Sequence, residues 1–224
     1  MNMTLVHPLL PEPIAFTEDK IAVLVVEAPK ELRKMIFALQ QQEAGHAGEF
    51  VLAEKFMPVE FSKYAALVTD PYALDFAAKK IAAKLTQQAL AAAKEAYGEQ
   101  LMAILAELNA LAAGISTMLD FEVAFSEMES PEALVKQMDF HIDRQLLDFP
   151  EQVLEYAKLQ QRVFGKKLVI FYNLKACLTE EEVKLLYKAL RYEKIPLLLL
   201  EDRQRPGGEE DENVTIIDKD LCVF

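Results

Sequence analysis

Short apolar runs alternate with segments of helical spacing near both ends of this chain. Continuous apolar runs of this kind are typical of strands that are buried on both faces of a parallel sheet. The helical segment after the first run begins at Pro29 and carries Leu32, Ile36 and Leu39 on one face. This alternation predicts an α/β domain. The predicted strands are 21–26, 50–52, 65–68, 168–172, 197–200 and 214–217.

The alternation stops in the middle of the chain, where residues 73–97 are rich in Ala, Leu, Lys and Gln, all good helix formers. Gly98 interrupts this segment, and residues 99–113 return to a helical composition. Two helices joined by so short a break are expected to pair antiparallel and to form an arm. The sequence therefore predicts a discontinuous α/β head, residues 1–72 with 148–224, interrupted by an α-helical leg at residues 73–147.

Local signals predict helix starts and turns at several points outside the arm. Thr179 with Glu182 forms a capping box, which predicts a helix from residue 180 onward. Asp70 before Pro71 fits the N-cap of a helix better than a metal or water ligand at a strand end. Residues 203–213 contain Pro206-Gly207-Gly208 and a run of acids, which predicts a flexible loop.

The net charge of −12 argues against a surface that attracts nucleic acid everywhere, because DNA affinity comes largely from Lys and Arg on phosphates. The charge is uneven, however. Residues 30–94 carry a net charge of +2, whereas residues 99–155 carry −10. This distribution is compatible with a local basic surface on an acidic protein.

The composition also bears on the compartment. No window of 18 apolar residues is free of charge, and the first ten residues lack the cationic start of a signal peptide. We therefore expect a cytoplasmic protein with no membrane partner. Cys177 and Cys222 are the only cysteines, and two reduced thiols are favoured over a disulfide in a chain of this size.

Motifs for common enzyme chemistries are absent. The first predicted strand is followed by Glu27-Ala28-Pro29-Lys30, which lacks the glycine-rich loop that cradles a triphosphate. The chain has no Gly-x-Ser-x-Gly elbow. His7, His46 and His141 lie far apart, without the spacing of a zinc site. We expect no catalysis and no nucleotide cofactor.

Two groups of charged residues are candidates for binding. Lys80 and Lys84 are four apart on a predicted helix, with Lys79 adjacent, and such a face can lie along a phosphate backbone. An ordinary solvated helix face is the favoured interpretation when the spacing is considered alone. The second group is acidic and lies within ten residues. It comprises Asp120, Glu122, Glu127 and Glu129.

The acidic group offers carboxylate oxygens, which hard cations such as calcium prefer. The spacing and glycine of an EF-hand are missing, so an acidic solvated turn is somewhat favoured from these residues alone. Glu201-Asp202 ends another predicted strand, where acids can hold a metal ion or a water molecule. A solvated strand end is the alternative interpretation there.

Several short motifs follow one another in a fixed order along the chain. Residues 166–203 combine a Lys-Lys-Leu-x-Ile-Phe-x-Asn strand, a Leu-Thr-x-x-Glu-Val helix start and an apolar strand ending in Leu-Glu-x-Arg. The other motifs are Leu9-Leu10-x-Glu12-Pro13-Ile14, Leu67-Val68-Thr69-Asp70 with Asp75, and Leu119-Asp120-Phe121-Glu122. In this order, and over essentially the whole chain, they resemble the small ring-forming protein of type II-A CRISPR adaptation modules, the Csn-two family.

The resemblance implies a degenerate P-loop-like head with a mixed sheet, interrupted by a long helical leg. It also implies a homotetrameric ring, supported by calcium, that threads the ends of double-stranded DNA through a positively lined hole. Proteins of this family are not catalytic. They serve spacer acquisition in CRISPR antiviral defence, beside the integrase complex and the effector nuclease.

Site residues follow from the resemblance with different degrees of detail. Asp120 and Glu122 match the acidic metal-binding stretch; where the family often has the next acid, this chain has Ala124, and Glu127 substitutes for it. The lysines of the helical insertion match the family in their general position along the chain, not residue by residue. The resulting candidates for DNA contact are Lys79, Lys80 and Lys84 in the leg, with Lys30, Arg33 and Lys34 in the earlier basic segment.

Two other functions remain as alternatives. The first is a nucleotide-dependent enzyme with a P-loop-like fold, against which the missing Gly-Lys-Ser/Thr loop argues. The second is an interaction scaffold that binds only proteins. A scaffold would form an oligomer without salt-sensitive affinity for DNA.

Overall fold

The computed structural model describes residues 3–224, and the chain divides into two compact units. The first unit, which we call the head, joins Met1–Leu74 with Arg144–Phe224. The second unit, the leg, is Asp75–Asp143. The sequence pattern placed these boundaries at 72/73 and 147/148, and residues 1 and 2 of the predicted head lie outside the described residues.

A five-stranded parallel sheet forms the centre of the head, with strand order β6-β7-β8-β3-β9. Its four strands other than β9 are largely apolar on both faces, and every residue of β3 is buried. The five apolar runs expected to form this sheet are confirmed, and the α/β class with them. The strands are β3 (Ile21–Val26), β6 (Ala65–Val68), β7 (Leu168–Tyr172), β8 (Leu197–Glu201) and β9 (Glu212–Ile217).

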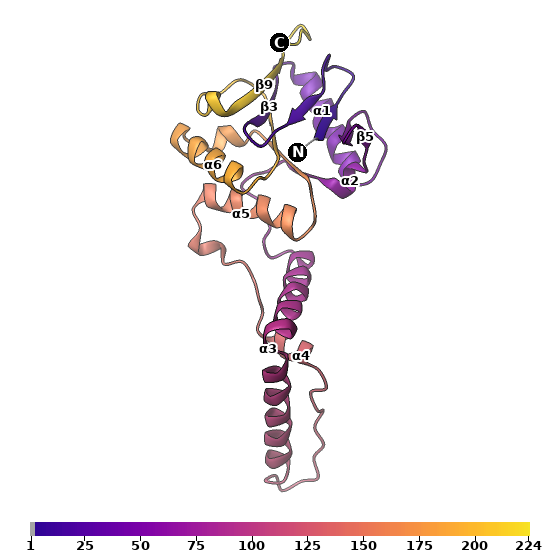
Figure 1. The fold of residues 1–224 in the computed structure, drawn as a ribbon, viewed down its shortest axis with the longest axis vertical. Helices are drawn as coiled ribbons and strands as arrows, with labels where there is room; N and C mark the ends of the chain where they lie inside the picture. Colours follow the sequence, from indigo (N-terminus) through magenta and orange to yellow (C-terminus); the bar gives the residue numbers. More distant parts are fainter. Residues whose placement is uncertain (1–2) are drawn as a thin grey trace. The chain divides into compact units, whose positions relative to one another are not determined.

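Helices cover both faces of this sheet (Figure 1). The chain passes from β6 to β7 to β8 along the sheet through α5 (Phe149–Arg162) and α6 (Glu180–Tyr192). From β3 it returns to β6 in the opposite direction through α1 (Pro29–Glu43) and the short α2 (Phe61–Tyr64). Because crossovers between parallel strands are right-handed, the two directions of travel place their helices on opposite faces.

The helix starts of the head follow from local sequence. The capping box predicted for α6 is confirmed, since Thr179 Oγ1 accepts from the amide of Glu182 and the Glu182 carboxylate accepts from the amide of Thr179. A second capping box opens α5, where Asp148 and Glu151 exchange the same pair of bonds. Pro29 stands in the first turn of α1, where its missing amide hydrogen costs nothing.

A second, antiparallel sheet packs on the α1 side of the head, with strand order β2-β1-β4-β5. Its inward residues, among them Met3, Leu5 and Leu52, belong to one core cluster with Leu32 and Leu39 of α1. In place of the mixed sheet that the resemblance implies, the head has one parallel and one antiparallel sheet, because the antiparallel strands pair only with one another. They are β1 (Met3–Val6), β2 (Ile14–Phe16), β4 (Val51–Glu54), which overlaps the run predicted at 50–52, and β5 (Met57–Pro58).

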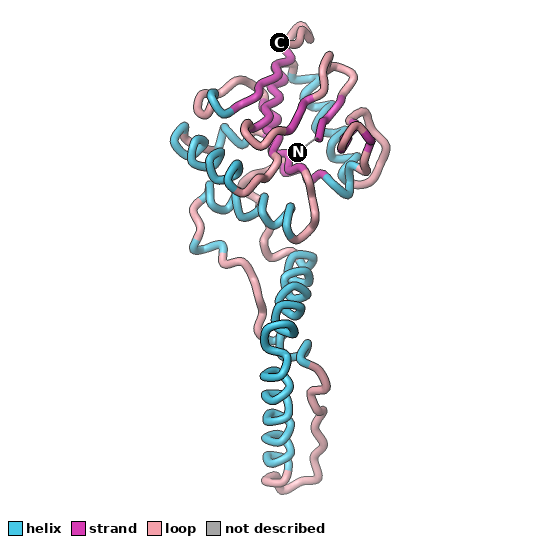
Figure 2. Tube along the Cα trace, viewed as in Figure 1, coloured by secondary structure: helices cyan, strands magenta, loops and turns pink. Residues whose placement is uncertain are grey.

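The leg is built on one long helix, α3 (Lys79–Ser116), which Figure 2 shows as cyan coils. The predicted antiparallel pair of helices is wrong. Gly98 stays inside the helix, and only Tyr97 leaves helical geometry (φ −134°, ψ 18°), so the chain kinks and continues instead of reversing. It returns along α3 as a segment without regular structure, and Asn109 holds this segment through two bonds to the backbone of Met128 (3.0 and 3.1 Å).

The return segment leads into α4 (Pro131–Gln137), which packs against α3. The start of the leg also differs from expectation, because residues 73–78 precede the helix. Asp70 does not cap a helix there. Its carboxylate accepts from the amide of Tyr72 (3.0 Å) and closes a turn.

Candidate nucleic-acid interface

The first half of α3 carries four exposed lysines, which we call the lysine face: Lys79, Lys80, Lys84 and Lys94. At the 3.6 residues per turn of an α-helix, these positions fall within an arc of about 140° and extend over about 22 Å. The first acid of α3 is Glu95, so the charged residues of the helix from 79 to 94 are all cations. In the part of the chain that the structure describes, none of these lysines forms an ion pair, and Lys84 reaches only Gln87 (3.4 Å).

The other three predicted contacts lie in the first two turns of α1. Lys30, Arg33 and Lys34 are exposed, and Lys34 pairs with Glu31 at 2.7 Å. The six predicted residues therefore belong to two units, three to the leg and three to the head. Lys34 is partly neutralised by its pair, whereas the lysine face has no such acid within its own stretch of helix.

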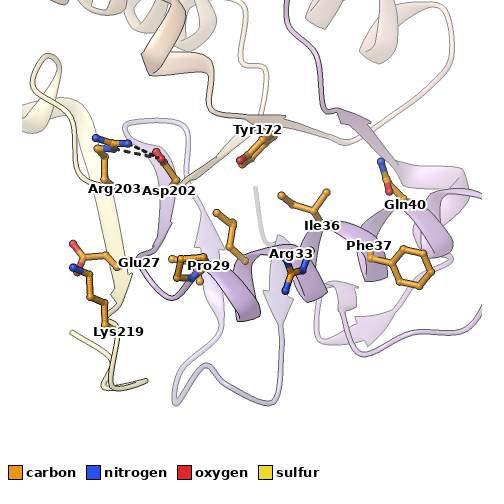
Figure 3. A pocket seen from close by; sticks show the side chains of 12 residues that line it. Glu27, Pro29, Arg33, Ile36, Phe37, Gln40, Tyr172, Asp202, Arg203 and Lys219 are labelled. Carbon is orange, nitrogen blue, oxygen red and sulfur yellow. Dashed lines mark hydrogen bonds and ion pairs between the residues drawn. The ribbon is translucent and has the colours of Figure 1, made fainter.

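Arg33 also lines a cavity of about 780 Å³ at the carboxyl edge of the parallel sheet (Figure 3). Its floor is the end of β3, with α1 along one side and the ends of β7 and β8 along the other. This edge is where open α/β sheets bind their ligands. The lining residues are Val26, Glu27, Pro29, Leu32, Arg33, Ile36, Phe37, Gln40, Tyr172, Asp202, Arg203 and Lys219.

The turn between β3 and α1 offers few amides to an anion. Glu27 donates its amide to the carbonyl of Ile217 (2.8 Å), and Pro29 has none. The amide of Leu32 is bonded inside the helix to Ala28. A triphosphate is normally cradled by the long run of amides of a glycine-rich loop, and this proline-containing turn has no such loop.

A buried ion-pair network lies under α6 and ties down the chain between β8 and β9. Lys175 Nζ contacts Glu212 Oε1 at 2.6 Å, and both side chains are less than 5% exposed. Tyr187 Oη donates to the same oxygen (2.7 Å). The amide of Lys175 donates to Glu201, whose second oxygen pairs with Arg205 at 2.7 Å. The spacing of these residues along the sequence does not predict the network.

The network corrects the interpretation of this part of the sequence. Glu201 is buried, so a solvated strand end is wrong for it. The loop predicted as flexible at 203–213 is anchored by Arg205, and its last residues form the start of β9. Gly208 adopts a left-handed backbone (φ +80°) against the ring of Tyr187, where a Cβ atom would meet the ring at 2.5 Å.

Burial perturbs the titration of the network. It raises the pKa of Glu201 to about 7, against the opposing effects of the Lys175 amide and of Arg205. Burial and then Glu212 raise the pKa of Tyr187, so its hydroxyl stays protonated and remains a donor. The carboxyl group of Glu201 therefore changes charge near neutral pH.

Because the folded pKa of Glu201 is raised, protonation favours the folded state. The stabilisation that protonated Glu201 gives the folded state is complete below pH 4.5, the ordinary pKa of a glutamate. It is lost as the pH rises through about 7, the pKa of Glu201 in the folded protein. Relative to Glu201→Gln, which cannot ionise, the parent should lose up to about 3 kcal/mol of stability between these pH values. Urea unfolding of both proteins from pH 4.5 to 8 measures the difference, and parallel pH profiles would contradict the assignment.

The four acids of the predicted metal site are not assembled by the fold. Asp120, Glu122, Glu127 and Glu129 are exposed along the irregular return segment of the leg. Among residues 3–224, no group of three or more His, Cys, Asp or Glu side chains could hold a metal ion. As placed in one chain, these residues do not fit a calcium site, and we derive no step from calcium.

The second half of α3 presents an exposed apolar stripe formed by Ile104, Leu108, Leu111 and Ile115. Their spacing of four, three and four residues keeps them within about 60° of arc, as in the seam between two packed helices. The adjoining return segment exposes Met118 (82%) and Phe121 (79%). Exposed apolar side chains grouped in this way are common at sites of association, so the stripe is a candidate association surface.

Cys177 and Cys222 are free thiols, as expected. Within residues 3–224, no helix combines the length and the apolar character that crossing a membrane requires.

Comparison with known families gives a match over most of the chain. A family model described as CRISPR-associated protein (Cas_Csn2) matches residues 42–221, which is most of the chain. The matched range takes in most of the parallel sheet, the whole leg and the buried network. Among curated proteins, the sequence comparison finds no match.

The solved structures that this chain matches include ATP-binding cassettes of ABC transporters, at low identity. One is cbiO1 from Clostridium perfringens, part of the ABC transporter complex cbiONQ, with 12% identity and a TM-score of 0.48 over 93% of this chain and 77% of that chain. Another is a nucleotide-free ATP-binding cassette from an ABC transporter, with 7% identity and a TM-score of 0.49 over 97% and 88%.

Proposed function

This chain belongs to the Cas_Csn2 family of CRISPR-associated proteins, and on that premise we propose that it binds the ends of double-stranded DNA as a closed homotetrameric ring, without reading base sequence. The lysine face is the observation that carries the proposal. Four exposed lysines over about 22 Å of helix match a phosphate backbone better than they match a set of base edges. We therefore assign the DNA contact to phosphates.

The apolar stripe supports the assembly part of the proposal. Four aliphatic side chains in a seam on one helix are costly to leave in water, and a second copy of the same helix is complementary to them. The lysine face lies in the other half of α3, beyond the kink at Tyr97, so association through the stripe leaves the lysines free for DNA. The strongly acidic composition of residues 99–155 would keep DNA away from this half of the leg.

We propose no catalytic activity and no nucleoside triphosphate cofactor, since the turn after β3 has no glycine-rich amide cradle and the family resemblance implies none. The head would then be a degenerate relative of P-loop domains that serves as a scaffold for the ring. The role would be spacer acquisition in CRISPR antiviral defence, in the cytoplasm, with the integrase complex and the effector nuclease as partners.

A gel-shift comparison of linear duplex DNA with a covalently closed circle of the same sequence tests the ring. Linear DNA should bind and the closed circle should not, because a closed ring can load only over an end. Affinity for the linear form should fall steeply with salt, as expected for phosphate contacts.

The circle itself supplies the control. Cutting it once with a restriction enzyme must restore binding, since the sequence and the composition are then unchanged. Equal binding to both forms would mean an open basic surface and would refute the ring. Binding to neither would favour a protein-only scaffold.

Calcium binding stays a prediction, because within residues 3–224 the acids of a single chain do not form a site for the ion. If a second copy completes a site around Asp120 and Glu122, the variant Asp120→Ala/Glu122→Ala should lower the mass of the assembly in calcium. Sedimentation in calcium and in EDTA measures this. An assembly whose mass is the same in both proteins and in both buffers would exclude a structural role for the ion.

A further inference from the structure

The cavity at the carboxyl edge of the parallel sheet has no role in the ring, and its lining is chemically specific. We propose that it binds a single nucleotide unit with one phosphate, either a free nucleoside monophosphate or an unpaired nucleotide at the end of a DNA strand. This inference goes beyond the proposed function and does not depend on the ring, because all of the lining residues belong to the head.

The charges that line the cavity favour an anion. Arg33 approaches from α1, Arg203 from the end of β8 and Lys219 from the turn after β9. Two acids also line it, but Asp202 is neutralised by Arg203 at 3.2 Å and by Arg205 at 2.7 Å. With Arg203 engaged by Asp202, Arg33 and Lys219 remain opposite one carboxylate, that of Glu27, so the lining carries a net charge of +1. Guanidinium groups are the usual partners of phosphate.

The remaining lining favours a flat apolar group attached to that anion. Tyr172 presents an aromatic ring from β7, and Ile36 of α1 lies across the cavity from it (Figure 3). Leu32 of α1 also lines the cavity. Burial raises the pKa of Tyr172, which keeps its hydroxyl neutral and able to donate a hydrogen bond. A nucleobase packs well against aromatic and aliphatic side chains. The volume of about 780 Å³ lies within the range of small-molecule sites.

The geometry limits how many phosphates the ligand can carry. Glu27 and Leu32 have already used their amides inside the protein, and Pro29 has no amide hydrogen. A chain of phosphates would lack the run of backbone donors that stabilises it, whereas one phosphate can be held by side chains alone. The inference is therefore a binding site for a monophosphate, without hydrolysis.

Calorimetric titration of the full-length protein with deoxyadenosine monophosphate tests the site. Deoxyadenosine, which lacks the phosphate, and deoxyribose 5-phosphate, which lacks the base, should each bind about tenfold more weakly or worse. The variant Arg33→Ala/Arg203→Ala should weaken the monophosphate by about tenfold or more. Both arginines are exposed at the surface, so their loss leaves the core intact.

Lys184→Ala/Lys188→Ala is the matched control, since it removes two exposed cations from α6, away from the lining, and should bind the monophosphate like the parent. Binding that is absent at about 1 mM, or unchanged in the arginine variant, overturns the site. A competition experiment distinguishes a free nucleotide from an unpaired nucleotide at the end of a DNA strand. Displacement of the monophosphate by a duplex with one unpaired nucleotide, but not by a blunt duplex, identifies a strand end, and displacement by neither identifies a free nucleotide.

The titration uses no duplex in its first stage, so it is independent of the ring proposal. A protein that binds the monophosphate but fails the linear-against-circle comparison would keep this site and lose the ring. A protein that passes the comparison but ignores the monophosphate would keep the ring and lose this site.

Discussion

Replacing Lys175 by methionine should lower the free energy of unfolding by about 3–5 kcal/mol, because it leaves the buried carboxylate of Glu212 without its cation. Both side chains are almost inaccessible to water, and their charged atoms are 2.6 Å apart. Methionine fills much of the same space, so the lost charge accounts for most of the effect. Urea unfolding followed by circular dichroism measures it.

An exposed ion pair supplies the control. Lys136 and Glu132 pair at 3.1 Å on α4 with 61% and 49% of their side chains exposed, and Lys136→Met should cost less than about 1 kcal/mol. In the double variant Lys175→Met/Glu212→Gln, part of the stability should return, because the remaining partner is neutral. A cost for Lys175→Met no greater than that for Lys136→Met would show that the buried pair is not stabilising.

Replacing Lys80 and Lys84 together by alanine should weaken binding to linear duplex DNA by about tenfold or more at moderate salt. Each phosphate that a lysine no longer neutralises keeps its counterion when the protein binds. The plot of log affinity against log salt should therefore become shallower, by about one for each such phosphate. Fluorescence anisotropy at several salt concentrations gives both quantities.

Lys184→Ala/Lys188→Ala makes the same change in charge, at the same spacing, on the exposed face of a helix of the head. It should leave the affinity and the salt slope near those of the parent. Equally weakened binding in the two variants would mean that only total charge matters, and unchanged binding in both would exclude the lysine face as the DNA contact. Alanine is a good helix former, so neither change should disturb its helix.

The strands of the parallel sheet could be predicted because their signal is local. A strand buried on both faces must be apolar at every position, as β3 and β8 are over nearly their whole length, and such a run is visible in the sequence alone. The antiparallel strands β1, β2 and β5 were missed because each is at most four residues long and none is buried throughout. So short a segment carries too few positions for a period of two to emerge.

Candidate residues of the leg were predicted in part. Lys79, Lys80 and Lys84 are exposed on one face, as the helical spacing required, and Lys94 lies on the same face but was not predicted. The prediction of two antiparallel helices was wrong because a glycine in a strongly helical sequence costs only about 1 kcal/mol. The helix propensity of the flanking residues of α3 outweighs this cost. The acids of the return segment were close in sequence but remain apart in an irregular chain.

Taken by itself, the sequence determined the class of the head, the place of the leg and the helix starts marked by Pro29 and Thr179, since each depends on residues within one turn or one strand. Only the tertiary structure decided which distant side chains meet. Lys175 and Glu212 are separated by 37 residues and share one buried contact, and Arg33 and Tyr172 line one cavity from two elements. Such pairings depend on the order of strands in the sheet and on the direction of each crossover, neither of which leaves a periodic trace along the chain.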